Sequence, residues 1–224
     1  MTLGIIGGTS LLFSDLPPLT KRQVHTPFGN AEILCGDVVM LMRHQNGMPP
    51  HRINFRANLA ALAIAGVDRV VSFGSSGSLK KGITPGSVVI PTDYMTVADI
   101  PSIHDHAIDH VRPGISLEIS SRLSRIITGS RLGGVYVQTR GPRIETIAEV
   151  RALAKVGDIV GMTVASEATL AGELGMAFAA VCTVDNYANG LDKEAPTWEH
   201  ILETSRSNRH RTGEIITGII RDLG

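Results

Sequence analysis

Short apolar runs alternate with segments of helical periodicity along this chain, and that alternation restricts its fold more than any other feature. Several runs are apolar on both faces, which is typical of central strands in a parallel sheet. The expected strands are Leu3–Ile6, Val38–Met42, Arg69–Phe73, Ser87–Ile90, Gly134–Gln138, Asp158–Met162 and Phe178–Val184. The expected helices are Ile53–Ala65, Ile144–Lys155, Ser166–Leu174 (capped by Ser166) and His200–Leu223.

This order of elements favours an α/β fold, in which helices flank a central β-sheet that is mixed but mostly parallel. The 224 residues contain no internal repeat, low-complexity tract or linker, so we expect a single domain over residues 1–224. The Pro- and His-rich stretch Ile100–Pro113 is the least regular part of the chain and is expected to form a loop.

The charge balance argues against a nucleic-acid partner, because 21 basic residues are matched by 21 acidic ones. No apolar run has the length needed to cross a membrane, and the N-terminus lacks the features of a signal peptide. We therefore expect a cytoplasmic protein. The two cysteines, Cys35 and Cys182, lie in apolar runs and are expected to be buried thiols.

Polar residues gather where the expected strands end. They are Gly7-Gly8-Thr9-Ser10, Arg43-His44, Gly74–Ser78, Met162-Thr163 and Asp185-Asn186-Tyr187. Ligands of open α/β sheets bind at the carboxyl ends of the strands. Hydroxyls, N–H groups of glycine-rich turns, one fixed cation and one histidine together suit an anion the size of phosphate.

Each group taken alone also has a simpler interpretation. A Gly-Gly-Thr turn is usually only a turn, and Arg43-His44 could equally be a surface pair. Gly74–Ser78 lacks the lysine of a P-loop and the spacing of a dinucleotide fingerprint. Three histidines fall within His104–His110 beside two aspartates, but their spacing fits no defined zinc pattern, so a solvated loop and no metal are expected.

Longer motifs follow in order along the chain. They are Gly4–Thr9, Thr26–Gly29, Arg43-His44, Pro49–Asn58, Gly141–Thr146, Gly161–Thr163, and Glu167 with Leu170–Glu173. By these motifs the chain resembles the trimeric purine nucleoside phosphorylase and methylthioadenosine phosphorylase family over nearly its whole length. It is most similar to the 6-oxopurine members that resemble methylthioinosine phosphorylase. The resemblance implies the nucleoside phosphorylase fold and a homotrimer or a dimer of trimers.

The resemblance also implies an activity and a site. The activity is phosphorolysis of a purine nucleoside, with inorganic phosphate as co-substrate and no other cofactor. The implied phosphate-binding residues are Thr9, Arg43, His44, Gly74, Ser75 and Thr163. The implied substrate-binding residues are Ile144, Glu145, Met162, Asn186, Tyr187, Ala188 and Trp198. Among these groups, the expected catalytic residues are Asn186, Glu145 and His44.

Two positions bear on the choice of base. Family members that act on 6-oxopurines resemble this chain in a glutamate at Glu145 and an asparagine at Asn186, whereas adenine-specific members have a small residue and an Asp-x-Asp pair there. A carboxylate can accept from the N1–H of hypoxanthine or guanine, and an amide can donate to O6 or N7. Ala188 cannot accept from a 6-amino group. The alternative is that Glu145 is only an acid in the first turn of a helix.

The sugar is less well determined. Trp198 stands where inosine and guanosine phosphorylases of the family have a histidine and methylthio-specific members have an apolar residue, so it favours a 5′-methylthio substrate. Trp198 is equally compatible with a core or subunit contact. The loop after His44 and the stretch Ile100–Pro113 are shorter than usual, and the histidine that closes over the sugar aligns with Ala107.

Three alternative functions fit the sequence less well. Methylthioadenosine phosphorolysis conflicts with Glu145 and Ala188. Hydrolysis conflicts with an anion pocket of Thr9, Arg43 and His44. A non-catalytic purine-binding homologue is compatible with the shortened loops.

Overall fold

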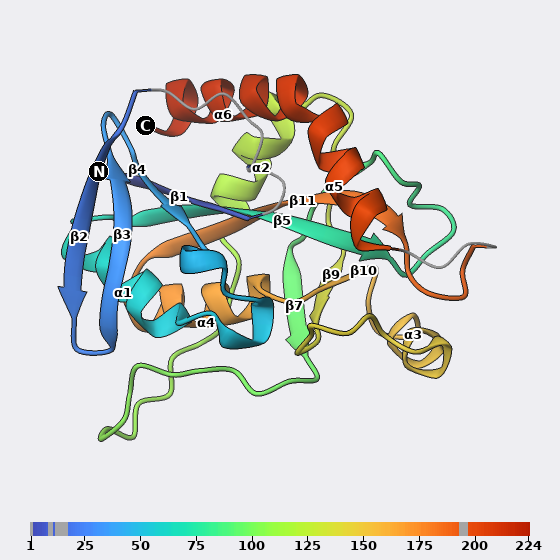
Figure 1. The fold of residues 1–224 in the computed structure, drawn as a ribbon, viewed down its shortest axis with the longest axis horizontal. Helices are drawn as coiled ribbons and strands as arrows, with labels where there is room; N and C mark the ends of the chain where they lie inside the picture. The colour runs from blue at the N-terminus through green and yellow to red at the C-terminus, as the bar shows by residue number, and fades with distance from the viewer. Residues whose placement is uncertain (1, 9–10, 12–17, 193–196) are drawn as a thin grey trace.

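One mixed β-sheet runs through the molecule (Figure 1). The computed structural model describes residues 2–8, 11, 18–192 and 197–224, with the backbone alone for 198, 200–202 and 205. Its strands are β1 (Leu3–Gly7), β2 (Thr20–Thr26), β3 (Gly29–Cys35), β4 (Val39–Met42), β5 (Arg69–Ser78), β6 (Val88–Ile90), β7 (Asp93–Thr96), β8 (Arg131–Leu132), β9 (Val135–Gln138), β10 (Ile159–Gly161) and β11 (Ala177–Tyr187).

The sheet combines two parallel groups that run in opposite directions. Strands β4, β1, β5 and β11 are parallel to one another, and so are β10, β9 and β7. The two groups meet where β10 pairs with β5 in the antiparallel sense. The expected mixed, mostly parallel sheet is therefore confirmed.

The meeting point of the two groups leaves part of one strand edge open. Strand β1 pairs with β5 as far as Ile6↔Ser72, and β10 pairs with β5 at Val160↔Gly77. The backbone of residues 73–76 thus lies between the ends of two strands that approach from opposite directions. The ends of β1 and β10 therefore both lie beside this short stretch of β5.

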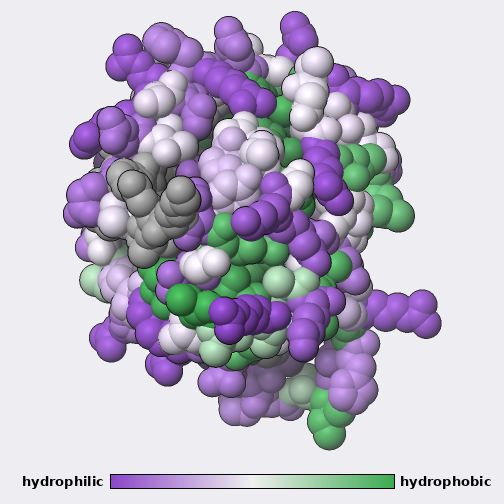
Figure 2. Space-filling model, turned by 90° about the vertical axis from the view of Figure 1, so that its right-hand side faces the viewer, coloured by the Kyte–Doolittle hydropathy of each residue, from purple (hydrophilic) through white to green (hydrophobic). Residues whose placement is uncertain are grey.

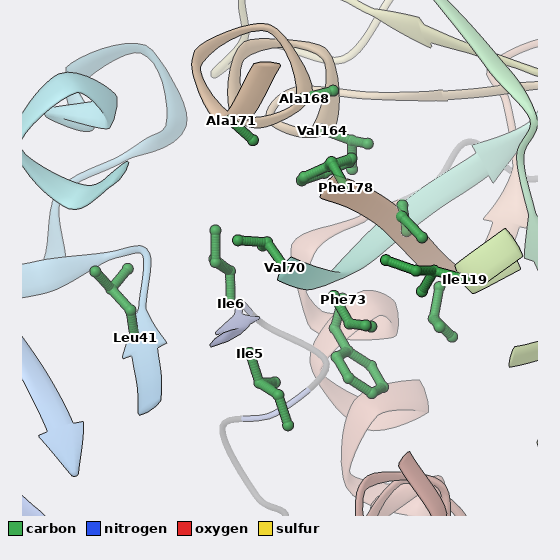
Figure 3. Packing of buried hydrophobic residues seen from close by; sticks show 14 of the residues in the cluster. Ile5, Ile6, Leu41, Val70, Phe73, Ile119, Val164, Ala168, Ala171 and Phe178 are labelled. Carbon is green, nitrogen blue, oxygen red and sulfur yellow. The ribbon is translucent and has the colours of Figure 1, made fainter. Parts of the chain in front are cut away.

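Helices cover both faces of the sheet (Figure 1). They are α1 (Phe55–Ile64), α2 (Leu117–Ile126), α3 (Ile147–Leu153), α4 (Val164–Glu173), α5 (Trp198–Ser207) and α6 (Arg209–Leu223). Helices α1 and α4 lie on one face, and α2, α5 and α6 lie on the other. Figure 3 shows Val164, Ala168 and Ala171 of α4 packed above the sheet near Val70 and Phe178. Phe73 points to the opposite face, as the period of a strand requires.

Two strands extend beyond their expected ends. The runs Arg69–Phe73 and Phe178–Val184 continue as β5 to Ser78 and as β11 to Tyr187, so Gly74 and Ser75 lie within a strand rather than in a turn. The two strands pair with each other along this extension, with a bulge between Val184 and Asn186. Mutual pairing satisfies the backbone, so the small residues of β5 do not turn the chain.

The helix boundaries also differ from expectation. Helix α3 starts at Ile147, because Thr146 and Glu149 form a capping box. Helix α4 starts at Val164 with Thr163 at its N-cap, so Ser166 is not the cap. The expected final helix is two helices, α5 and α6, separated at Asn208.

Several elements were not expected from the sequence. They are the hairpin of β2 and β3, the short strands β7 and β8, and α2, whose N-cap is Ser116. Ile100–Pro113 contains no helix or strand, as expected. Of the helices in the described part of the chain, none combines the length and apolar character needed to cross a bilayer.

Candidate active site

Arg43 lies directly after β4 and is almost completely buried. The exposed fraction of the residue is 3%. Its backbone N–H donates to the carbonyl of Gly7 at 2.8 Å, which joins the ends of β4 and β1. Its Nη1 lies against Gly8, where a β-carbon would collide with it. The alternative that Arg43 belongs to a surface pair is therefore wrong.

The guanidinium of Arg43 is held by three partners. Nε and Nη2 donate to the two carboxylate oxygens of Glu167 at 2.7 and 3.0 Å. Nη1 donates to the carbonyl of Phe73 at 2.7 Å, and Nη2 also donates to Ser72 Oγ at 2.8 Å. Four of the five N–H groups are thus directed into the protein. Within the described residues, the second hydrogen of Nη1 is the donor that remains for a ligand beside Gly8.

His44 is half-buried and follows Arg43 into the loop after β4. Its Nδ1 lies 2.8 Å from the carbonyl of Met48, which can only accept, so Nδ1 has the proton and Nε2 is free to accept. Burial holds the pKa of His44 below its usual value, and Arg43 adds to this, whereas the Met48 bond and Glu167 act in the opposite sense. A neutral ring with an acceptor nitrogen results.

The open edge of β5 has Gly74 buried and Ser75 half-buried. Strand alternation directs the N–H and C=O of Ser75 to the same edge as those of Phe73, whose carbonyl faces Arg43. The side chain of Ser75 donates instead to Asp185 on β11. Burial raises the pKa of Asp185 to about 6, and hydrogen bonds from Ser75 and Thr183 oppose that shift.

Thr163 is 7% exposed and is the N-cap residue of α4, but its hydroxyl forms no capping hydrogen bond. Instead, the buried phenol oxygen of Tyr136 accepts from the backbone N–H of Thr163 at 3.3 Å and of Val164 at 3.5 Å. Burial raises the pKa of Tyr136, so the phenol stays protonated. Tyr136 thereby fixes the start of α4 beside the open edge of β5.

Glu145 is a buried carboxylate in the loop before α3. It is 6% exposed, and Thr139 Oγ1 donates to its Oε1 at 2.6 Å. Asn189 Nδ2 donates to its backbone carbonyl at 3.1 Å. Because the cap of α3 is Thr146, Glu145 precedes the helix, and the alternative of an acid in the first turn is wrong.

Asn186 and Ala188 lie beside a glycine of β5. A β-carbon on Gly77 would come within 3.3 Å of Asn186 Nδ2 and 3.7 Å of the Cα of Ala188. The Asn186 amide nitrogen donates to the carbonyl of Tyr187 at 2.7 Å. Met162 is half-buried and lies against Gly141, the start of the segment that contains Glu145.

The remaining expected residues are less closely grouped. Ile144 is 37% exposed, and the hydroxyl of Tyr187 donates to the carbonyl of Lys81 at 3.2 Å. Thr9 lies outside the described residues. Trp198 is the first residue of α5, but its side chain also lies outside them.

Five residues near these groups were not expected as site residues: Ser72, Tyr136, Thr139, Glu167 and Asp185. Glu167 and Asp185 stood within quoted motifs, so their positions could have indicated them. No motif pointed to Ser72, Tyr136 or Thr139. In the part of the chain that the structure describes, no three histidine, cysteine, aspartate or glutamate side chains are grouped to hold a metal ion.

A cavity of about 490 Å³ opens beside Glu145. Its lining includes Thr139, Gly141, Arg140 and Arg143. Arg143 forms a two-point ion pair with Glu149 at 2.7 and 2.6 Å, which secures the capping box of α3. The face of the molecule beside α3 has an apolar area ringed by polar side chains (Figure 2).

The sequence model of the protein family described as "Phosphorylase superfamily" matches residues 2–221 of this chain. The chain belongs to the phosphorylase superfamily. This confirms the family resemblance indicated by the motifs, and the protein is an enzyme of the nucleoside phosphorylase type.

Relatives within the phosphorylase superfamily match nearly the full length. A "Probable 6-oxopurine nucleoside phosphorylase" of Archaeoglobus fulgidus is 37% identical, over 99% of this chain and 96% of the relative. A "Probable S-methyl-5'-thioinosine phosphorylase" of Methanocaldococcus jannaschii is 34% identical, over 97% and 91%. The methylthioadenosine phosphorylase of Schistosoma mansoni, solved in complex with adenine, has a TM-score of 0.85 at 25% identity, covering 98% of this chain and 91% of that one.

Proposed function

We propose that this protein catalyses the phosphorolysis of 6-oxopurine nucleosides. Inorganic phosphate attacks C1′, and the products are the free base and ribose 1-phosphate, or 5-methylthioribose 1-phosphate from 5′-methylthioinosine. The observation that decides for a 6-oxopurine is the buried Glu145 carboxylate, which is held by Thr139 and precedes the helix cap. The sequence relatives named for 6-oxopurine and methylthioinosine phosphorolysis support the same substrate class.

The proposed phosphate site is the open edge of β5. The free hydrogen of Arg43 Nη1, the N–H of Ser75 and the hydroxyl of Thr163 supply donors, and Thr9 and Gly74 complete the group. His44 Nε2 supplies an acceptor for a protonated phosphate oxygen. Because Glu167 balances the charge of Arg43, binding depends more on directed hydrogen bonds than on net charge.

The proposed base site lies between Glu145 and Asn186. Glu145 Oε2 accepts from purine N1–H, and the Asn186 amide donates to O6 or N7 as negative charge develops on the departing base. Adenine has a lone pair at N1, which a carboxylate repels, and Ala188 offers no acceptor to a 6-amino group. A site built on such hydrogen bonds rejects the wrong analogue by roughly 10⁴-fold. Ile144, Met162 and Tyr187 are proposed to line the nucleoside.

The proposed chemistry relies on position and electrostatics. The glycosidic bond stretches first, and the ribose gains oxocarbenium character. Phosphate below the ring stabilises this cation and then bonds to C1′ with inversion, while Asn186 stabilises the leaving base. Held geometry and preorganised donors supply the rate enhancement, and neither a metal nor an organic cofactor takes part.

Two further features are proposed for the same enzyme. The sugar has a 5′-methylthio group that contacts Trp198, which favours methylthioinosine over inosine. The assembly is a homotrimer or a dimer of trimers. The apolar area beside α3 in Figure 2 supports an interface on that face, since exposed apolar patches commonly mark protein contacts.

One assay tests the substrate assignment. The protein is incubated with inosine, 5′-methylthioinosine and 5′-methylthioadenosine, each with and without phosphate, and free base is measured. Release of hypoxanthine only with phosphate is expected. Base release without phosphate contradicts phosphorolysis. A preference for methylthioadenosine, the substrate class named for the solved Schistosoma mansoni enzyme, contradicts the role given to Glu145.

A variant pair separates the two halves of the site. Glu145→Gln is expected to lower turnover of 6-oxopurine nucleosides by about 10²-fold or more, with the KM for phosphate unchanged. Glu118→Gln is the matched control, because Glu118 is an exposed carboxylate in the first turn of α2, away from the proposed site. Sizing of the native protein tests the trimer.

A further inference from the structure

Thr139 is the residue that fixes the side chain of Glu145. Its Oγ1 donates to Glu145 Oε1 at 2.6 Å, a short hydrogen bond to a carboxylate that is 6% exposed. Hydrogen bonds to charged acceptors are shorter and stronger than those between neutral groups. The carboxylate is therefore held at one oxygen, and Oε2 remains available.

The backbone of Thr139 is itself tied to the phosphate side of the site. Its N–H donates to the carbonyl of Gly161 at 2.9 Å, at the end of β10. A β-carbon on Gly161 would lie 3.1 Å from the carbonyl oxygen of Ser75, so Gly161 touches the open edge of β5. Thr139 thus links the position of Glu145 to the strand ends around which the phosphate site is proposed.

The main chain of Glu145 is held separately. Asn189 donates to its carbonyl at 3.1 Å, and the next residue, Thr146, is the N-cap of α3. With the backbone fixed, rotation of the side chain is the freedom that remains. The Thr139 hydroxyl removes that freedom.

The Thr139 hydroxyl is not required for packing. Thr139 is half-buried and is one of the residues that line the cavity of about 490 Å³ together with Glu145. Replacing the hydroxyl by a methyl group would keep the volume and remove only the donor.

We propose that Thr139 is a positioning residue that determines base specificity, because its hydroxyl holds Glu145 with Oε2 directed at purine N1–H. This inference rests on the proposed function, in which Glu145 recognises the 6-oxopurine. Without the hydroxyl, Glu145 rotates among several orientations, and one of them satisfies N1–H. Binding and turnover of 6-oxopurines are weakened, whereas phosphate binding is unchanged.

The test compares Thr139→Val, which removes the donor, with Thr139→Ser, which keeps it. Three quantities are measured for each protein: kcat/KM for inosine, the Kd of free hypoxanthine and of free adenine, and the KM for phosphate. Thr139→Val is expected to lower kcat/KM and weaken hypoxanthine binding by about tenfold to a hundredfold. Thr139→Ser is expected to keep kcat/KM and the Kd of hypoxanthine within about threefold of the native values. Adenine binding and the KM for phosphate should stay unchanged.

Other outcomes overturn the proposal. A Thr139→Val enzyme with native hypoxanthine binding shows that Glu145 does not need the hydroxyl. An equal loss for hypoxanthine and adenine, or a raised KM for phosphate, shows a structural role. Glu145→Gln is measured in parallel: if it keeps native turnover of inosine, the proposed function of Glu145 fails, whereas loss in Glu145→Gln without loss in Thr139→Val defeats only the inference about Thr139.

Discussion

Arg43 and Glu167 form a two-point ion pair in which the arginine side chain is 2% exposed and the glutamate side chain 1% exposed. The pair joins the end of β4 to the first turns of α4, across 124 positions in the sequence. Ser72 bridges the pair, because its hydroxyl accepts a hydrogen bond from Arg43 and donates one to Glu167 Oε2 at 2.6 Å. The position of the guanidinium beside Gly8 therefore depends on Glu167.

Glu167→Gln is expected to destabilise the protein strongly. The substitution keeps the shape of the side chain but leaves a buried guanidinium without its counter-charge, and breaking a buried pair in this way costs about 3–5 kcal/mol of unfolding free energy. Urea unfolding measures the loss. Glu173→Gln on the same helix is the control, because Glu173 is half-buried and accepts from the backbone of Ile103. An equal effect of the two substitutions would contradict the role of the pair.

Asp185→Asn is expected to stabilise the protein at neutral and higher pH. Burial raises the pKa of Asp185 from 3.8 to about 6, so the folded state favours the protonated carboxyl. The stability from this group is complete below about pH 4 and is lost as the pH rises through about 6. The asparagine keeps an acceptor for Ser75 and cannot ionise. Its unfolding midpoint in urea should exceed that of the native protein at about pH 8 and equal it at about pH 4.

His44→Gln is expected to flatten the acid side of the stability profile. The pKa of His44 is lowered mainly by burial, so the unfolded state takes up a proton near pH 6.5 more readily than the folded state. Unfolding free energy from this group thus falls as the pH decreases through about 6.5. Glutamine can still donate to Met48 and removes the titration. The stability contribution of Asp185 changes with pH in the opposite direction. The contribution of His44 is therefore obtained as the difference between the pH profiles of the native and variant proteins.

The control for His44 is His25→Gln in the β2–β3 hairpin, where the histidine bonds to Asn30. Urea unfolding is measured at about pH 7 and about pH 5 for all three proteins. A native slope in His44→Gln would show that His44 does not titrate with a lowered pKa.

The sequence predicted the strands that are apolar on both faces, because such runs have no other favourable place than a covered sheet. β2 escaped prediction because five of its seven residues are exposed and only Val24 is buried. The end of β5 was not predicted because glycine and serine favour turns, whereas pairing with β11 keeps residues 74–78 extended. Tertiary pairing overrode local preference there.

The candidate site could be predicted only in part for a similar reason. Motifs at strand ends located Arg43 and Asn186, and the family motif Gly141–Thr146 located Glu145. They did not reveal that Glu167 would neutralise Arg43, because no local spacing relates residues 124 positions apart. Nor did they reveal Thr139, since a threonine in a loop has no pattern of its own, and its role depends on where the loop folds back.

Gly161→Ala is expected to destabilise the protein by about 1–3 kcal/mol through overpacking. A β-carbon there would collide with the hydroxyl of Tyr136 and lie 3.1 Å from the carbonyl oxygen of Ser75. Neither neighbour can move freely, because Tyr136 is fully buried and Ser75 belongs to β5. Gly172→Ala in α4 is the control: the nearest side-chain atom, Cγ1 of Val111, would lie 3.8 Å from the new β-carbon, so no loss is expected.

A double-mutant cycle identifies the collision. Tyr136→Phe alone should cost about 1 kcal/mol, because the backbone N–H groups of Thr163 and Val164 lose their acceptor. In the double variant the alanine at position 161 no longer meets the hydroxyl, so the combined loss should be smaller than the sum of the single losses by about 1 kcal/mol. Relief is partial, since the ring carbon that bears the hydroxyl would still lie 3.0 Å from the new β-carbon. Strict additivity in urea unfolding would show that the cost of Gly161→Ala arises at Ser75 instead.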